Sequence, residues 1–434
     1  MLVPTQEQTA VWCASVLHWR IRMRRVGLLA VLFGPALSIS HAAAVSEPAQ
    51  AWRIVEGRAH AAVTSPAAVR AVAIEFNEQA ITASTGEMVL SLFEQRQAYR
   101  TTIVETRAQG RYTWRGQLKA NPDYVAFITV HDGHLAGLVN TPEGAFELLP
   151  TADGNLLVQL DQGRFDACGG AVEPGHWVEP AVSRTTAPDP LAPEDSGDDI
   201  KVLVMYSPAA RDAAGGVAQI AAQAQAAVDS ANTAFVGSGM RMRFATAGIE
   251  LLDGWVEGTT SASTELGNFR ANATAQERRN ALNADLVSLL VAELPGACGI
   301  GYVMRTTNVS FAPSGYQLTD RDCAVGNLSW AHEHGHNVGF EHDPANGASP
   351  ASASRPWSFG HYVESGTAYR TVMSYQCPAG NCTRQPRFSN PRVTFNGAPT
   401  GIEGQRDNAR TGDAVADTVA SFRMVDFAFR SGFE

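Results

Sequence analysis

The chain has 434 residues, of which 45% are hydrophobic and 18% charged, and its formal net charge is -10. Because this length exceeds what one hydrophobic core usually supports, we expect at least two folded units. The composition excludes a wholly disordered chain. An acidic chain offers no basic surface to attract nucleic acid or an anionic membrane, so neither is an expected partner.

The N-terminus has the order of a secretory signal peptide. Four arginines within residues 20–25 precede an apolar run at 26–39, and small residues follow at 40–44. The run is shorter than the roughly 20 residues that a membrane-spanning helix needs. We therefore expect removal of residues 1–44, secretion and no stable membrane insertion, with Met23 as an alternative initiator. A buried N-terminal helix is the disfavoured alternative.

Residues 45–172 are predicted to form a β-rich domain. Short apolar runs alternate with turn residues here, as at 71–76, 101–106 and 124–130, and such runs are typical of strands. A stretch rich in proline and acidic residues follows at 173–199. This composition predicts a protease-accessible linker.

Residues 200–425 differ in character, because buried-strand runs alternate with helical patterns. We predict strands at 200–205, 240–250, 286–291 and 300–304, and helices at 217–235 and 273–283. Strands that alternate with helices indicate a mixed α/β domain. The apolar segment 426–434 remains a C-terminal tail without an assigned role.

Five cysteines lie beyond the predicted signal peptide, and an odd number leaves one unpaired. The four from Cys298 onward can form two disulfides in an oxidising compartment, with three connectivities. Sequence proximity favours Cys298 with Cys323 and Cys377 with Cys382. Cys168 is then the free thiol.

One short segment has the residue types and spacing of a zinc site. On a helix, His332 and His336 project from the same face, so both imidazoles can bind one ion. Glu333 can reach a water at the metal without becoming a ligand, as a general base must. Gly339 can adopt a positive φ and end the helix, which would return His342 as the third ligand.

Three protein ligands leave a tetrahedral zinc ion with an open fourth position, as a catalytic site requires. The shorter HExxH pattern is a weak signal by itself. Chance would add both Gly339 and His342 with a probability of only about 0.002 at this composition. Ordinary core or surface histidines are therefore the disfavoured interpretation. His334 points away from the ligand face and is not predicted to bind metal.

The stretch from His332 to His342 matches the HExxHxxGxxH signature and resembles the metzincin metallopeptidases. The segment from Thr371 to Tyr375 resembles the metzincin Met-turn, in which Met373 would form an apolar floor beneath the zinc. Tyr375 resembles the tyrosine of astacin-like and serralysin-like members that stabilises the oxyanion.

Asp343 and the segment 387–391 resemble the bacterial reprolysin-like branch, which includes peptidyl-Asp metalloendopeptidases. The resemblance covers roughly residues 200–425. It implies an α/β metzincin-type catalytic domain with a mixed twisted sheet and an active-site helix, preceded by a β-rich prodomain. Asp343 would anchor the helix without binding the metal, and 301–305 would be the cleft-edge strand that pairs with extended substrate.

Cys168 acquires a role from this resemblance. A thiolate is a good zinc ligand, so Cys168 could take the fourth position and keep the precursor inactive. This resembles the cysteine switch of metzincin propeptides, although the flanking residues do not reproduce the usual motif. An ordinary free or buried cysteine is the alternative.

The sequence thus predicts a secreted zinc metalloendopeptidase, made as a zymogen, with Glu333 as general base and Tyr375 assisting the oxyanion. We expect one zinc ion, protein or peptide substrates and a monomer. A calcium site near Asn390 has no support in the spacing. Two alternatives remain: a secreted binding module with a structural zinc, which requires a fourth protein ligand, and a zinc amidase acting on a non-peptide substrate.

Cleavage specificity is not readable from the sequence. Three arginines, Arg370, Arg384 and Arg387, lie near the predicted Met-turn and could line an acid-selective pocket. Surface positions are the commoner explanation for arginines, and we expect that for these three.

Overall fold

The structure is a computed structural model that describes residues 49–58, 63–82, 86–175, 199–380 and 382–423. The predicted signal peptide, most of the predicted linker and the C-terminal tail lie outside these residues. Within the described part of the chain, no helix is both long and apolar enough to cross a membrane.

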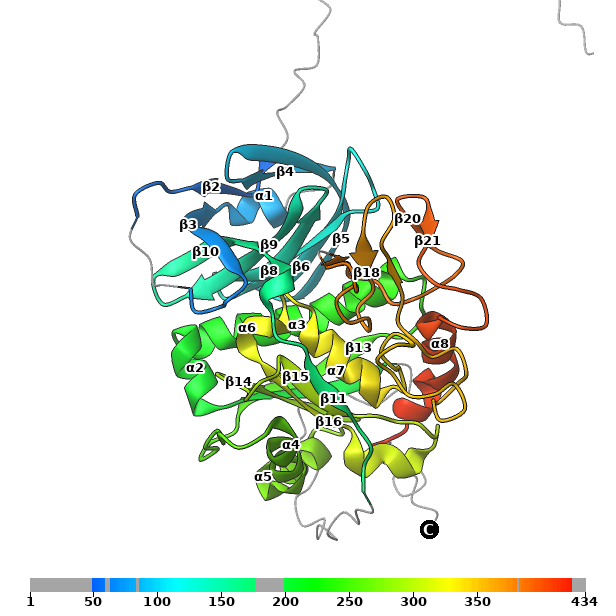
Figure 1. Cartoon of the computed structure of the whole chain (residues 1–434). Helices are drawn as coiled ribbons and strands as arrows, with labels where there is room; N and C mark the ends of the chain where they lie inside the picture. The colour runs from blue at the N-terminus through cyan, green and yellow to red at the C-terminus, as the bar shows by residue number, and fades with distance from the viewer. Residues whose placement is uncertain (1–48, 59–62, 83–85, 176–198, 381, 424–434) are drawn as a thin grey trace, which may run out of the picture. The chain divides into compact units, whose positions relative to one another are not determined.

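A ten-stranded sheet built from residues 49–160 makes up the N-terminal region (Figure 1). Its strands, in spatial order, are β1 (Ala49–Gln50), β4 (Glu87–Leu92), β5 (Gln95–Ala108), β6 (Arg111–Leu118), β7 (Val125–His131), β8 (His134–Thr141), β9 (Gly144–Thr151), β10 (Gly154–Leu160), β3 (Ala68–Phe76) and β2 (Trp52–Ile54). All neighbours are antiparallel except β1 and β4. The three strands predicted by example overlap β3, β5 and β7. A short helix, α1 (Glu78–Thr82), connects β3 to β4.

A second, six-stranded sheet is mixed, as predicted. Its spatial order is β11 (Cys168–Val172), β15 (Gly299–Tyr302), β16 (Tyr316–Asp320), β14 (Leu286–Val291), β12 (Ile200–Tyr206) and β13 (Phe244–Leu251). Only β15 and β16 pair antiparallel. Every residue of β12 is buried, which is the pattern of a strand covered on both faces.

Helices cover both faces of this second sheet (Figure 1). The helices are α2 (Pro208–Ala214), α3 (Val217–Gly237), α4 (Ala262–Ala271), α5 (Ala273–Ala281), α6 (Arg321–Ala324), α7 (Ser329–Asn337) and α8 (Asn408–Val419), with 3-10 turns η1 (Gln162–Arg164) and η2 (Val309–Ser314). The long helix α3 contacts β7, β8 and β9 of the first sheet and β13 of the second. Because α3 lies between two sheets, it is buried from Ile220 to Phe235, polar residues included.

The N-terminal region and the region beyond residue 199 share one hydrophobic core. Phe127 and Leu138 of the first sheet belong to the same buried cluster as Val202 and Leu286 of the second. The predicted boundary at residue 172 also differs from the strand pairing, because β11 joins the second sheet instead of the first. The edge of β15 offers unpaired N–H and C=O groups, and β11 satisfies them.

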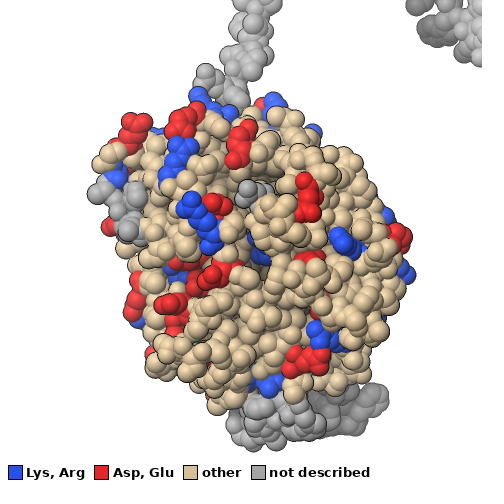
Figure 2. Space-filling view, in the orientation of Figure 1, with Lys and Arg blue, Asp and Glu red and all other residues tan. Residues whose placement is uncertain are grey.

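Between α7 and residue 423, the described residues form only short strands, apart from α8. These are β17 (Tyr362–Val363), β18 (Tyr369–Arg370), β19 (Thr383–Arg384), β20 (Thr394–Phe395) and β21 (Ala398–Pro399). Disulfides join Cys298 to Cys323 and Cys377 to Cys382, the pairings that sequence proximity favours. Cys168 is free. On the face shown in Figure 2, acidic and basic side chains are interspersed over the described surface.

Candidate active site

Helix α7 and the turn after it bring three histidines together. His342 Nε2 lies 3.1 Å from His332 Nε2 and 3.0 Å from His336 Nε2, and all three rings are buried. The chain turns back at Gly339, whose φ is +86°. A Cβ there would lie 2.9 Å from the carbonyl oxygen of Met304, so a side chain would be both strained and crowded.

Backbone carbonyl groups orient each imidazole of this histidine group. The three Nδ1 atoms lie 2.8, 2.8 and 3.2 Å from the carbonyl oxygens of Val372, Phe340 and Asn346. Each Nδ1–H therefore donates to a carbonyl, and each Nε2 presents a lone pair toward the other two. Three lone pairs in contact repel one another unless a cation lies between them, so the donor set fits a metal ion.

The protonation states of these histidines also fit a metal. Burial lowers the pKa of His336 to about 4 and that of His342 to about 3, and it holds the pKa of His332 well below the ordinary value. Neutral imidazoles are the form that binds metal ions. The site is therefore ready to accept a cation at neutral pH without first losing protons.

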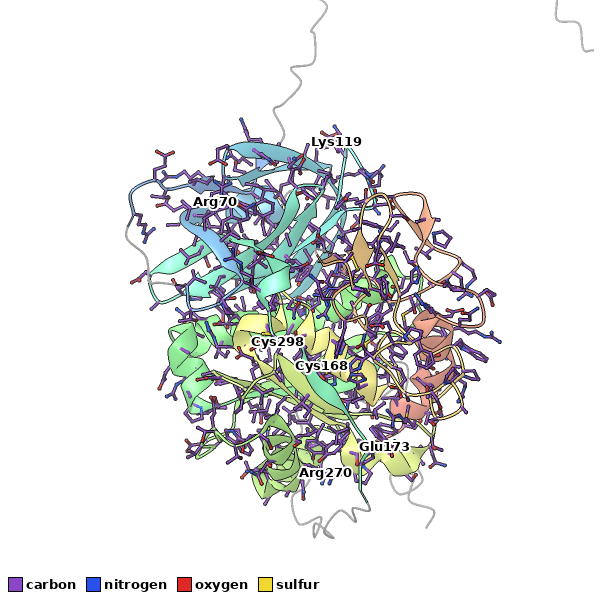
Figure 3. The ribbon with its side chains drawn as sticks, in the orientation of Figure 1. Arg70, Lys119, Cys168, Glu173, Arg270 and Cys298 are labelled. Atoms are coloured by element: carbon purple, nitrogen blue, oxygen red, sulfur yellow. A yellow bond between two sulfur atoms is a disulfide. The ribbon has the colours of Figure 1, made fainter. Side chains whose placement is uncertain are left out.

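Cys168, labelled in Figure 3, lies at the start of β11 against the histidine group. Its Sγ is 3.8 Å from His336 Nε2 and 3.5 Å from Glu333 Oε2. One ligand atom from each of Cys168, His332, His336 and His342 falls within 4.8 Å of the others. Burial, and next the charge of Glu333, raise the pKa of the thiol well above its ordinary value.

Glu333 is the buried carboxyl beside the histidines. Its Oε1 accepts no hydrogen bond from any described residue, while Oε2 is the atom near Cys168. Burial raises the pKa of Glu333 to about 8. A carboxyl with one free oxygen and a raised pKa is suited to take a proton and to give it up again.

The predicted Met-turn packs directly beneath α7. Met373 is completely buried, and a Cβ on Gly335 of α7 would come within 2.4 Å of its Sδ. Glycine at position 335 is therefore what lets the methionine approach the helix. Tyr375 follows, with its ring 4.3 Å from that of His342 and its hydroxyl 3.1 Å from the carbonyl oxygen of Cys168. Burial raises the pKa of Tyr375, so the phenol keeps its proton.

Asp343 connects the turn after α7 to the segment that carries Tyr375. Its carboxylate accepts hydrogen bonds from the Tyr375 backbone N–H at 3.1 Å, the Ser374 hydroxyl at 3.3 Å and the Asn346 side chain at 2.9 Å. It is not among the grouped ligand atoms. Asp343 thus positions the turn and the tyrosine.

Two further residues of α7 anchor the helix without facing the histidine group. The Asn337 side chain donates to the carbonyl oxygens of Tyr302 on β15 and Tyr316 on β16. His334 is fully buried and packs edge-on against Trp330, with ring centroids 4.3 Å apart. His334 is therefore a packing residue, and it lies outside the group of candidate metal ligands, as predicted.

The chain's own segment covers the strand edge next to the histidine group. Strand β11 pairs in parallel with β15, with Cys168 opposite Gly299 and Val172 opposite Tyr302. Strand β15 ends at Tyr302, so it contains only the first two residues of the edge strand predicted at 301–305, and the Val303 N–H still donates to the Val172 carbonyl at 2.9 Å. At the end of that range, Arg305 forms ion pairs with Glu341 at 2.7 Å and with Glu173.

A cavity of about 470 Å³ opens beside the site and is lined by Glu173, Arg305, His342, Asn346 and Tyr375, among others. Figure 3 labels Cys168 and Glu173 at the two ends of the covering segment. The covering segment therefore leads from the histidine group to this cavity.

The structure corrects one expectation about the arginines. Arg370, Arg384 and Arg387 are 4%, 4% and 7% exposed, so the surface interpretation is wrong. Their guanidinium groups donate to backbone carbonyls inside the protein. Runs of irregular chain between short strands leave many carbonyls without ladder partners, and long arginine side chains satisfy them.

Sequence reasoning missed the groups that orient the site. The carbonyl groups of Val372, Phe340 and Asn346 carry no residue signature, so no sequence pattern could have indicated them. The Asn390 side chain, considered for calcium, donates to the Ser238 carbonyl and accepts from the Arg392 N–H.

Comparisons with known proteins agree with this geometry. The model of the metallopeptidase family M12B, reprolysin-like, matches residues 221–343. A peptidyl-Asp metalloendopeptidase of Stenotrophomonas maltophilia (strain R551-3) is 29% identical over 91% of this chain and 94% of its own length. The protein of that name from Pseudomonas fragi is 33% identical over 27% of this chain and 75% of its own length. Among solved structures, metalloproteinase-II from Bacteroides fragilis matches 62% of this chain and 85% of that chain at 9% identity, with a TM-score of 0.37 that carries no inference.

The chain therefore belongs to the reprolysin-like metallopeptidases. It is a zinc metalloendopeptidase, a hydrolase of peptide bonds.

Proposed function

We propose that the protein is a secreted zymogen whose single catalytic zinc ion is held by His332, His336 and His342. The observation that carries the proposal is the convergence of three buried, neutral Nε2 atoms, each fixed by a carbonyl at Nδ1. When bound, the ion supplies Lewis acidity, which polarises a carbonyl group and lowers the pKa of water. Tetrahedral zinc sites with three histidines are well known among catalytic sites.

The proton chemistry falls to Glu333 and Tyr375. The Glu333 carboxylate takes a proton from the attacking water and later delivers it to the nitrogen of the leaving amine. The Tyr375 hydroxyl, which keeps its proton, donates a hydrogen bond to the oxygen that gains negative charge. In the precursor this hydroxyl donates instead to the Cys168 carbonyl, so the oxyanion donor is already engaged.

Latency follows from the segment that precedes the predicted linker. We assign residues 1–44 as signal peptide, 45–172 as propeptide domain, 173–199 as linker, 200–425 as catalytic domain and 426–434 as tail. Cys168 would lose its thiol proton on coordinating zinc, since bound thiols deprotonate. The pairing of β11 with β15 supports the same role, because it fills the edge where an extended substrate would pair.

One observation favours the structural-zinc alternative, which requires a fourth protein ligand. Cys168 together with the three histidines makes a closed set of four. However, Cys168 lies before the protease-accessible linker, so cleavage there would remove the fourth ligand and open the position. That arrangement supports a removable inhibitor over a permanent structural site.

The substrate proposal comes from the relatives, which are named peptidyl-Asp metalloendopeptidases. We propose that this protein likewise cleaves proteins or peptides at aspartyl residues. It acts as a monomer, and neither nucleic acid nor membrane is a partner.

The test compares the secreted protein with Glu333→Gln after cleavage of the linker by an added protease. Glu277→Gln, at an exposed position of α5, is the matched control. We expect about one zinc per chain in all three proteins, and a loss of peptidase activity of about 10²–10⁴-fold in Glu333→Gln alone. A chelator should abolish the activity of the wild type and of the control.

Two results would contradict the proposal. Retained activity in Glu333→Gln would remove the general base from the mechanism. Zinc in every protein with no cleavage by any, even after removal of the Cys168 segment, would favour the structural-zinc module.

A further inference from the structure

Two arginines lie side by side in the interior next to the Met-turn. Arg370 on β18 and Arg384 on β19 occupy paired positions of adjacent parallel strands, and each is 4% exposed. Placing two like charges together inside a protein is unfavourable unless an anion compensates them.

Neither arginine forms an ion pair with a carboxylate among the described residues; Glu333 acts on Arg384, and Asp343 on Arg370, only through space. Arg384 donates to the carbonyl oxygens of Asn327 at 2.7 Å and Ser374 at 3.2 Å, and its Nε is buried without a partner. Arg370 donates to the carbonyl oxygens of Cys382 at 3.3 Å and Ser374 at 3.0 Å. All of these acceptors are neutral, so no carboxylate among the described residues contacts either guanidinium group.

Arg305, on the other side of the cleft, shows what a balanced arginine looks like in this protein. Its guanidinium contacts the carboxylates of Glu341 and Glu173, and Glu341 belongs to the catalytic region and would remain after the propeptide leaves. By contrast, the guanidinium groups of Arg370 and Arg384 donate to backbone carbonyls and contact no carboxylate of the described residues.

The buried pair of Arg370 and Arg384 lies close to the catalytic groups. Arg384 acts electrostatically on Glu333 and Tyr375, lowering the pKa of each against the larger effect of burial. Its acceptor Ser374 stands between Met373 and Tyr375 in the Met-turn. A substrate group that reached Arg384 would therefore sit beside the bond to be cleaved.

A neutral side chain of the N-terminal region, Gln162, contacts the backbone of Arg384. Gln162 Oε1 accepts from the Arg384 backbone N–H at 2.8 Å, and Gln162 Nε2 donates to the Gly326 carbonyl at 2.8 Å. A cavity of about 260 Å³ adjoins it, lined in part by Gly163, Gln376 and Thr383. Departure of the propeptide would uncover the segment that carries Arg384.

We propose that Arg384, with Arg370 behind it, is the anion-recognition group that selects a substrate with a carboxylate side chain beside the scissile bond. The proposal rests on the proposed peptidase function and names the residues that give it acid specificity. A substrate carboxylate supplies a counter-ion in direct contact, and the planar guanidinium fork matches the geometry of a carboxylate. A carboxamide has the same shape but no charge. An Asn substrate therefore leaves the two arginines without a contacting counter-ion.

The test uses two peptides that differ only by Asp or Asn at the cleavage position, with linker-cleaved wild type, Arg384→Gln, Arg384→Lys and Arg241→Gln. Arg241 is an exposed arginine paired with Asp417 and serves as the control. We expect the wild type and the control to prefer Asp by at least a hundredfold in kcat/KM. Arg384→Gln should reduce that ratio below tenfold while changing Asn cleavage less than threefold, and Arg384→Lys should retain an intermediate ratio.

Binding gives a second readout that does not depend on turnover. Calorimetry on Glu333→Gln should give a Kd for the Asp peptide at least tenfold below that for the Asn peptide. Adding Arg384→Gln should remove that difference. If Arg384→Gln is not obtained in folded form, two other readouts test the proposal. These are the Asp-to-Asn ratio of kcat/KM in Arg370→Gln and the difference in Kd between the two peptides in Glu333→Gln.

The outcomes separate the two proposals. Cleavage without any preference for Asp, or an unchanged ratio in Arg384→Gln, overturns the role of Arg384 and leaves the peptidase intact. No cleavage of either peptide by the wild type overturns the proposed function and the role of Arg384 with it.

Discussion

Two carboxylates are buried where the N-terminal region meets the rest of the chain, and their surroundings differ in charge. Asp229, on α3, is fully buried and accepts hydrogen bonds from Arg107, Thr113 and Thr129 of the first sheet, with Arg115 at 3.6 Å. Two arginines and two hydroxyls thus balance and satisfy one carboxylate.

Glu147, on β9, lacks that balance. Its carboxyl accepts from the Gly326 backbone N–H, and its nearest charged groups, Asp322 and Arg321, have opposite signs. Burial, and next Asp322, raise the pKa of Glu147 to about 8, and the pKa of nearby Asp320 rises to about 7 for the same reasons. The comparison teaches that ion pairs and hydrogen bonds hold the Asp229 side of this junction, whereas the stability of the Glu147 side depends on protonation.

The largest expected effect comes from breaking the balanced side with Asp229→Asn. The change removes the fully buried carboxylate that pairs with Arg107 and Arg115 and leaves them only Glu105 as a counter-ion. We expect the free energy of unfolding of the uncleaved protein to fall by about 3–5 kcal/mol. Urea unfolding of the purified precursor measures this. Asp253→Asn, at an exposed position, is the control and should change stability by less than about 0.5 kcal/mol. Equal stability of the two variants would show that the Asp229 contacts do not stabilise the junction.

The unbalanced side predicts a pH dependence of defined sign. Since the folded pKa of Glu147 is about 8 and the ordinary value is 4.5, the folded protein keeps a proton that the unfolded chain releases. Stability should therefore fall as pH rises from about 4.5 to about 8 and level off above that. Glu147→Gln cannot ionise, so we expect it to match the wild type near pH 5 and to exceed it at pH 9 by about 2–4 kcal/mol.

The measurement is thermal unfolding of precursor and variant across that pH range. Glu143→Gln, exposed on the turn before β9, is the matched control and should follow the wild type. If Glu147→Gln and the wild type differ in stability by the same amount at pH 5 and pH 9, the raised pKa of Glu147 is wrong.

The smallest expected effect in free energy is on latency. Cys168→Ser removes the proposed fourth metal ligand from the junction but keeps the strand pairing of β11, so the uncleaved protein should gain about tenfold in peptidase activity. Thr64→Ala, which removes the 2.6 Å hydrogen bond to Asp322, touches the junction away from the metal group and should leave activity unchanged. Equal activity of both precursors would assign inhibition to β11 and not to the thiol.

The sequence predicted the parts that depend on local pattern. The spacing of His332, Glu333 and His336 requires only a helix, and α7 is that helix. Buried apolar runs likewise predicted β12, β14 and β15, because a strand that is covered on both faces is apolar at nearly every position.

What the sequence could not predict depends on groups far apart in the chain. Burial of Arg370 and Arg384 follows from the neutral carbonyls that surround them, and carbonyls are present at every residue. The pairing of β11 with β15 joins segments more than 120 residues apart, and nothing in five residues with two glycines indicates which sheet they will join. The periodicity of a segment determines whether it forms a helix or a strand, whereas contacts between distant segments determine which strands pair.

The parallel pairing of β11 with β15 has a consequence for the edge of the six-stranded sheet. An open β15 would end the six-stranded sheet in a row of unpaired N–H and C=O groups, the kind of surface on which other chains nucleate aggregates. While β11 is in place that sheet ends in a short strand containing Gly169 and Gly170, which are poor templates for further addition. The segment that lies over β15 therefore also shields an aggregation-prone edge of the sheet for as long as it stays in place.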